Sequence, residues 1–154
     1  MYIDMMEKWY SENIDAQWMP LRHRIMGLLQ DEAELEEIVK LVGMDALNAQ
    51  DRLKLEAARS IREDYLHQDA FHEIDTYASL DKQCIMMKLM LDYFDITSKA
   101  VEDGKPVQAL IDLEVRERIG RIKYVSEDKV KAEYDDIISE LKKAVDAIKR
   151  VDED

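Results

Sequence analysis

One stretch in the second half of the sequence limits the fold most. Between Cys84 and Leu91 the only polar residue is Lys88, and a helix that is apolar on nearly all sides is normally surrounded by other helices. We expect this helix to span residues 80–101, with Ser79 placed to cap it. Four glycines and two prolines among 154 residues are too few turn formers for a many-stranded sheet. The sequence therefore predicts an all-α fold with this helix at its centre.

Apolar residues recur at helical spacing in six other stretches, and each stretch predicts a helix with one buried face. These stretches cover about residues 2–9, 18–28, 35–42, 49–65, 107–122 and 127–148. The acidic segment Gln30–Glu37 suits the N-terminal turn of the third helix, because negative charge is favourable at that end of the helix dipole. Ser126 is placed to cap the last helix, which we expect to pair antiparallel with the one before it. We therefore predict a helical bundle of about six or seven helices in one domain, residues 1–154.

Two of these helices are expected to form a protruding hairpin. Gly43 supplies the backbone freedom that ends the first helix, and Asn48 is placed to cap the second. The tip then lies at Met44–Gln50. The two buried faces are predicted to consist of Leu35, Ile38, Val39 and Val42 in the first helix and of Leu53, Ala57, Ile61 and Tyr65 in the second.

Charge and composition exclude several classes of protein. The net charge is −13, from 22 basic and 35 acidic residues, which opposes binding to the phosphates of a nucleic acid. No apolar run is long enough to insert into or span a membrane, and acidic Asp4 and Glu7 stand where a signal peptide carries positive charge. Cys84 is the single cysteine and is interpreted as a small buried hydrophobic residue in a reducing compartment.

No catalytic motif is apparent. The four glycines are isolated from one another, so the chain has no glycine-rich loop that could hold a phosphate, and no nucleophile stands in a recognisable elbow. His67 and His72 are five residues apart, about 140° around a helix, whereas helical zinc ligands are usually four apart. Together with Asp69, Glu73 and Asp75 they leave a metal site open, but the spacing favours polar loop and cap residues.

Several short motifs identify a resemblance. Arg62–Leu66 reads REDYL, Gln68–Phe71 reads QDAF, and Ile74–Tyr77 reads IDTY, all downstream of Gly43-Met44-Asp45. This order resembles the C-terminal domain of rotary ATPase catalytic subunits, and most of all the A subunit of archaeal A-type and vacuolar enzymes. The resemblance covers roughly residues 9–91.

The resemblance implies a part in nucleotide binding without catalysis. It implies that ATP or ADP with Mg is held by a nucleotide-binding core elsewhere in the same subunit, and that this domain alone has no activity and binds no cofactor. In that family the phenylalanine of this loop packs on the adenine ring, which places Phe71 in the adenine pocket with Ala70 and, less directly, Tyr77. Such contacts orient the base and leave the phosphates to other residues.

The resemblance also implies partners and a location. The partners are the nucleotide-binding core, the B subunits of the catalytic hexamer and the central shaft, in an ATPase head that is cytoplasmic and peripheral to the membrane. The rotor contact falls on Met44, Asp45, Leu47 and Asn48. Aligned with the acidic DELSEED segment of the F-type β subunit, this tip has lost three acidic positions, to Ala46, Ala49 and Gln50. We therefore expect the hairpin to push by shape more than by charge.

A second hypothesis comes from the composition alone. A free-standing acidic helical adaptor that binds a partner helix in a groove would show the same stripes and the same lack of catalytic motifs.

Overall fold

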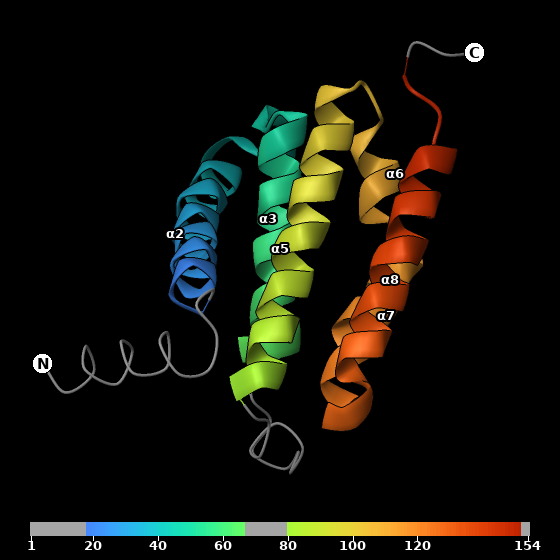
Figure 1. Ribbon diagram of the computed structural model, residues 1–154. Coiled ribbons are helices and arrows are strands. Elements are labelled where there is room, and N and C mark those ends of the chain that lie inside the picture. The colour runs from blue at the N-terminus through green and yellow to red at the C-terminus, as the bar shows by residue number, and fades with distance from the viewer. Residues whose placement is uncertain (1–17, 67–79, 152–154) are drawn as a thin grey trace, which may run out of the picture.

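The computed structural model describes residues 18–66 and 80–151, and within those ranges every regular element is helical (Figure 1). In chain order the elements are α2 (Trp18–Val42), the 3₁₀ turn η1 (Met44–Ala46), α3 (Ala49–Ile61), the π-helical turn η2 (Arg62–Leu66), α5 (Leu80–Glu102), α6 (Val107–Ile111), α7 (Val115–Arg121), the 3₁₀ turn η3 (Ile122–Tyr124) and α8 (Glu127–Ala147). The prediction of an all-α bundle is confirmed.

The helices alternate in direction along the bundle (Figure 1). α2 and α3 form an antiparallel pair on one side of α5, while α6, α7 and α8 lie on the other side. α6 and α7 together carry the chain back along the bundle, so that α8 runs parallel to α5 and packs along it. The expected antiparallel pairing of the last helix is therefore found between α8 and α7.

α5 is the central helix, as its apolar run predicts. It packs against α2, α3 and α8, and its buried side chains extend over most of its length. They are Cys84, Met86, Leu89, Met90, Leu91, Tyr93, Thr97 and Ala100. The deeply buried phenol of Tyr93 in this core donates a hydrogen bond of 3.0 Å to the carbonyl oxygen of Leu110 in α6.

The prediction of two helices between residues 18 and 42 is wrong. α2 is continuous from Trp18 to Val42, because the buried face passes without interruption from Ile25 and Leu28 to Leu35. Most of the acidic residues of Gln30–Glu37 simply occupy the outer face of that helix. They are solvated side chains in the middle of a helix and mark no helix start.

The prediction of one helix over residues 107–122 is also wrong. The chain breaks into α6 and α7 because the turn between them satisfies the end of α6 with a side chain. The guanidinium of Arg116 donates a hydrogen bond of 2.7 Å to the carbonyl oxygen of Ile111, the last residue of α6. The four-residue apolar spacing persists across the break, so periodicity alone could not reveal it.

Several predicted helix boundaries are confirmed. Gly43, the predicted end of the first hairpin helix, follows α2 with a φ of +91°, a conformation that favours glycine. Gly104 follows α5 in the same way, with a φ of +96°. The side chain of Asn48 caps α3 by accepting a hydrogen bond of 2.8 Å from the amide of Asp51. Ser126 occupies the N-cap position of α8, but its side chain makes no capping hydrogen bond. The predicted Ser79 cap and the helix over residues 2–9 lie outside the described residues.

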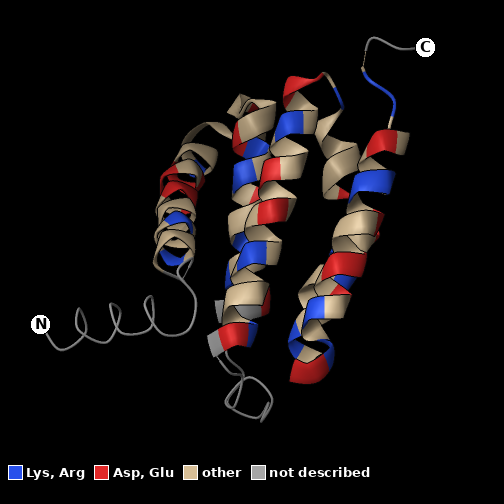
Figure 2. Cartoon of the chain, viewed as in Figure 1, with Lys and Arg blue, Asp and Glu red and all other residues tan. Residues whose placement is uncertain are grey.

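Acidic and basic residues are interspersed along the described helices (Figure 2). Arg118 of α7, for example, is paired with three carboxylates of α8, those of Glu133, Asp136 and Glu140. Such partly exposed pairs contribute little each, although a network of them holds α7 against α8. Among the helices that the structure describes, none has the length and apolar character needed to cross a bilayer.

Candidate interaction site at the end of the hairpin

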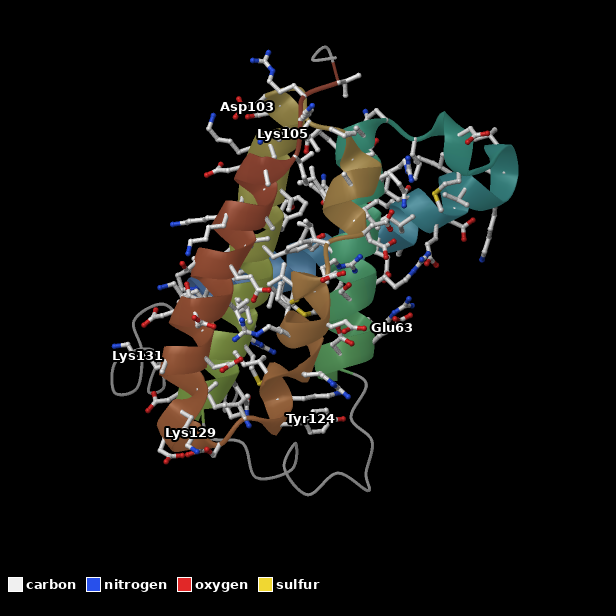
Figure 3. The ribbon with its side chains drawn as sticks, turned by 90° about the vertical axis from the view of Figure 1, so that its right-hand side faces the viewer. Glu63, Asp103, Lys105, Tyr124, Lys129 and Lys131 are labelled. Carbon is white, nitrogen blue, oxygen red and sulfur yellow. The ribbon has the colours of Figure 1, made fainter. Side chains whose placement is uncertain are left out.

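The hairpin of α2 and α3 packs in two separate parts. Near its root, Ile25 and Leu28 of α2 belong to the main core around α5. Towards its end, Leu35, Leu47 and Leu55 form a second cluster of their own, with Val39 packed against it. Figure 3 shows this end of α2, with η1, standing clear of the rest of the bundle. The sequence predicts a protruding hairpin, and in the structure only the end of α2 and the tip protrude.

The tip residues predicted to contact a rotor differ in their accessibility. Met44 and Asp45 are exposed in η1, and Asn48 is exposed although its side chain caps α3. Leu47 is only 8% exposed and packs into the second cluster. Leu47, which the resemblance placed in the rotor contact, therefore packs within the hairpin and closes it.

An apolar surface at this end was not predicted. Leu41 and Val42 are 81% and 65% exposed, and Ile38 and Met44 are also exposed large hydrophobics. We call these four residues the apolar end patch. The sequence analysis placed Ile38 and Val42 on the buried face, but the structure packs only Leu35 and Val39 there. The signal was present in the sequence: four of the five residues 38–42 are apolar, which is too many for one face of a helix.

The start of α3 is fixed to the bundle by polar contacts. The amide group of Gln50 and the end of α5 exchange two hydrogen bonds: Gln50 Nε2 donates to the carbonyl of Ser98 at 3.0 Å, and Ser98 Oγ donates to Gln50 Oε1 at 2.9 Å. Arg52 Nη2 donates to Gln108 Oε1 of α6 at 2.6 Å. The end of the hairpin is thus carried on a base that is joined to both α5 and α6.

Ion pairs contribute little to the surroundings of the apolar end patch. The nearest ion pair in α2 joins Lys40 to Glu37 at 3.9 Å between two well-exposed side chains, and a pair of this kind contributes between nothing and about 1 kcal/mol. Along the parts of the chain that the structure describes, no group of three or more His, Cys, Asp or Glu is placed to hold a metal ion. The arrangement is suited to contact with another surface.

The other predicted site residues cannot be placed. Ala70, Phe71 and Tyr77 lie outside the described residues, and so does the polar group between His67 and Asp75 that left a metal site open.

Comparison with known proteins gives a consistent result over almost the whole chain. The family model for the C-terminal domain of V and A type ATP synthase matches residues 7–111. V-type ATP synthase alpha chains from Acetivibrio thermocellus, Clostridium botulinum strain Okra and Thermoanaerobacter pseudethanolicus are 54%, 52% and 49% identical over 148 residues, which is 96% of this chain. The chain spans about a quarter of the length of these relatives, 25% in each case. These relatives are bacterial, whereas the sequence motifs alone pointed to archaeal and vacuolar enzymes.

The family match extends through the hairpin and α5 to the end of α6, and the pairwise identity continues through α7 and α8. On both counts the chain belongs to the family of C-terminal domains of V and A type ATP synthases.

Proposed function

We propose that this chain serves as the lever of the A subunit in a rotary ATPase, with the apolar end patch bearing on the central shaft. The observation that carries the proposal is the patch itself, whose Leu41 and Val42 are among the most exposed apolar side chains of the described chain. Exposed apolar residues gathered at one point commonly mark a contact with another molecule. The family to which the chain belongs supplies the context of a rotary complex.

The lever acts as a rigid body. The hydrogen bonds of Gln50 and Arg52 join the base of the tip to α5 and α6, so a rotation of the whole domain moves the tip with it. Force is transmitted by shape and by apolar contact. Covering one fully exposed leucine side chain stabilises a contact by about 1.5 to 3 kcal/mol, which exceeds the contribution expected from the exposed carboxylate of Asp45.

The adenine-side wall is the second part of the proposal. By the family resemblance, Phe71 and Ala70, with Tyr77 beside them, contact the adenine of ATP or ADP whose phosphates and Mg are held by the nucleotide-binding core. This core, the B subunits and the shaft are the proposed partners, and the whole assembly is the cytoplasmic head of the ATPase. The chain itself would carry out no hydrolysis.

Crosslinking in the assembled ATPase tests the lever. We expect a cysteine at Met44 to crosslink to the shaft in at least one rotary state, since Met44 is exposed at the tip. The native Cys84 is buried and does not compete. Met26→Cys is the matched control: Met26 is exposed on the same helix but near its root, and it should form no such crosslink. Absence of a crosslink from Met44 in every rotary state would remove the shaft contact.

Torque measurements separate shape from charge. Replacing Leu41 and Val42 together with serine should lower the torque, while replacing Asp45 and Asp51 together with asparagine should leave ATP-driven rotation nearly intact. The reverse result would show that charge drives the contact. The free-standing adaptor has no observation in its favour, because the identity to the V-type ATP synthase alpha chains covers almost the whole sequence.

A further inference from the structure

A pocket of about 200 Å³ opens between the end of α3 with η2, the middle of α5, and α7. It lies at the opposite end of α3 from the hairpin tip. Its apolar walls come from Met90 and Tyr93 of α5 and from Ile119 of α7, none of which is more than 3% exposed. An apolar cavity of about 150 Å³ in a protein is large enough to hold benzene. This pocket therefore has room for a small organic molecule.

The positive charge in the lining of this pocket is already engaged. The guanidinium of Arg116 donates hydrogen bonds to the carbonyl oxygen of Ile111 at 2.7 Å and to Ser60 Oγ. It also lies 3.5 Å from Glu56 Oε1, and its Cζ is 5.7 Å from the centre of the Tyr93 ring. Arg116 is therefore held as part of the pocket wall, and Glu56 balances its charge.

The carboxylate of Asp64 lines the same pocket without a partner. Within the part of the chain that the structure describes, it makes no hydrogen bond and no ion pair. Burial raises the pKa of Asp64, and the positive charge of Lys123 opposes that rise. Glu117, which is exposed, adds a second negative charge to the lining. Because a partly buried carboxylate is stabilised by a cation that also donates hydrogen bonds to it, the pocket favours a positively charged ligand.

Gly120 determines where the Asp64 carboxylate lies. A Cβ added to Gly120 would be 3.0 Å from Asp64 Oδ2 and 3.2 Å from Asp64 Cγ, distances that real Cβ atoms rarely show. Gly120 has no positive φ, so glycine is needed here for space and not for backbone freedom. Asp64 itself is carried by the π-helical turn η2, a rare geometry that is often found at functional sites. The carboxylate is thus set directly against the backbone of α7.

We propose that this pocket is a binding site for a small organic cation, whose ammonium group pairs with Asp64 and whose apolar body lies against the apolar walls. The negative lining disfavours carboxylates and phosphates of the same size. The walls favour a ring or a short alkyl chain over a bare inorganic ion. Neither the apolar end patch nor a nucleotide takes part in this site, so the inference goes beyond the proposed function and does not depend on it.

Benzylamine and benzoate test the site in the full chain, because they share a ring and carry opposite charges. Benzylamine should shift the methyl resonances of Met90 and Ile119 in a saturable way, with a Kd of about 1 mM, as expected for a ligand of this size. Benzoate should bind at least about tenfold more weakly. Equal binding of the two, or no saturable shift with benzylamine up to about 10 mM, would overturn the proposal.

Asp64→Asn tests the carboxylate, because asparagine has nearly the same shape without the charge. The substitution should weaken the binding of benzylamine by roughly tenfold to a hundredfold, the scale of a hydrogen bond to a charged group. Glu63→Gln is the matched control: it removes a negative charge from the same turn at an exposed side chain that does not line the pocket (Figure 3). It should change the Kd by less than about twofold. Equal losses from the two variants would contradict the proposal.

A further pair of variants covers the case in which Asp64→Asn fails to fold. Gly120→Ala keeps the carboxylate but displaces it, and it should weaken the binding of benzylamine by about threefold or more. Gly27→Ala makes the same change inside a helix, at a site where a Cβ meets nothing within 4 Å, and it should leave the Kd unchanged. If Gly120→Ala folds and binds benzylamine as tightly as Gly27→Ala does, Asp64 does not hold the cation and the proposal fails.

Discussion

Arg62, at the start of η2, lies 3.2 Å from the carboxylate of Glu32 in the middle of α2. Glu32 is 5% exposed, and its Oε2 atom has no hydrogen-bond partner, since the contact lacks hydrogen-bond geometry. Glu32 also stands in sequence between Leu28 of the main core and Leu35 of the second cluster. A buried carboxylate paired with the charge of Arg62 thus separates the two parts of the hairpin.

The first prediction concerns the pH dependence of this carboxylate. Burial raises the pKa of Glu32, the positive charge of Arg62 opposes the rise, and Glu36 adds to it. A raised pKa in the folded state means that the contribution of Glu32 to stability is greatest below the ordinary value of 4.5 and is lost as pH rises through the raised pKa.

We therefore expect Glu32→Gln to raise the free energy of unfolding at neutral pH, with a gain that shrinks to nothing below pH 4.5. Urea unfolding between pH 3.5 and about pH 8 measures this, with Glu34→Gln on the exposed side of the same helix as the control. A gain that does not depend on pH would refute the assignment.

The second prediction compares two helix caps. The side chain of Asn48 makes a capping hydrogen bond and that of Ser126 does not. Asn48→Ala should therefore lower the free energy of unfolding by about 1 kcal/mol, within the range of roughly 0.5 to 2 kcal/mol for such caps. Ser126→Ala should change it by only about 0.3 kcal/mol. Equal losses from the two substitutions in chemical denaturation would show that the capping bond of Asn48 carries no stability.

The third prediction compares two glycines. Gly43 has φ +91° and ψ 165°, a region that is almost restricted to glycine, so Gly43→Ala should destabilise the chain by about 1 to 3 kcal/mol. Gly27 lies on the exposed side of α2 in open space, and Gly27→Ala should stabilise it by about 0.5 to 1 kcal/mol. Thermal unfolding should shift in opposite directions for the two variants.

The fourth prediction concerns the buried Tyr93. Burial raises the pKa of this phenol from 10 to about 12, with the charge of Arg116 opposing the rise. The unfolded chain therefore loses the proton first as pH rises above 10, and stability falls between pH 10 and about 12. Tyr93→Phe should remove this contribution to the fall in the free energy of unfolding at alkaline pH. At neutral pH it should lower the free energy of unfolding by about 1 kcal/mol, because the hydrogen bond to Leu110 is missing. Tyr124→Phe, at an exposed ring, is the control and should leave the free energy of unfolding at neutral pH nearly unchanged.

The fifth prediction tests the adenine wall directly. In the assembled ATPase, Phe71→Ala should raise the apparent Kd for nucleotide roughly threefold to tenfold, because an aromatic stacking contact contributes about 0.5 to 1.5 kcal/mol beyond buried area. The Mg-dependent chemistry should remain recognisable. A variant that lowers only the stability of the chain and leaves nucleotide affinity alone would place Phe71 in the core instead.

Features that depend on a few neighbouring residues could be predicted from the sequence. The turn at Gly43 and the cap at Asn48 are local chemistry, and the central position of α5 follows from a run that leaves no polar face. The helix start near Gln30 was wrong because acidic residues suit both a first turn and an exposed face. The break after Ile111 was missed because the four-residue apolar spacing continues across it, and that spacing does not report the hydrogen bond from Arg116 that ends α6.

The candidate site was predictable only in part. The sequence placed the tip at Met44 and identified its loss of acidic residues. It could not show that Leu47 is buried and Leu41 exposed, because this depends on how α2 packs against α3. The approach of Asp64 to Gly120 joins residues 56 positions apart, and no pattern in one sequence reports a contact of that kind.

The parallel course of α5 and α8 has a consequence for how the chain reaches this fold. The contact between α5 and α8 cannot form until α6 and α7 have led the chain back along the bundle. Closing a loop of this length slows a folding step. α2 with α3 needs only near neighbours in sequence. We expect this pair to assemble early and α8 to dock last, so that Ile137 on α8, buried against the finished bundle, affects the rate of unfolding far more than the rate of folding.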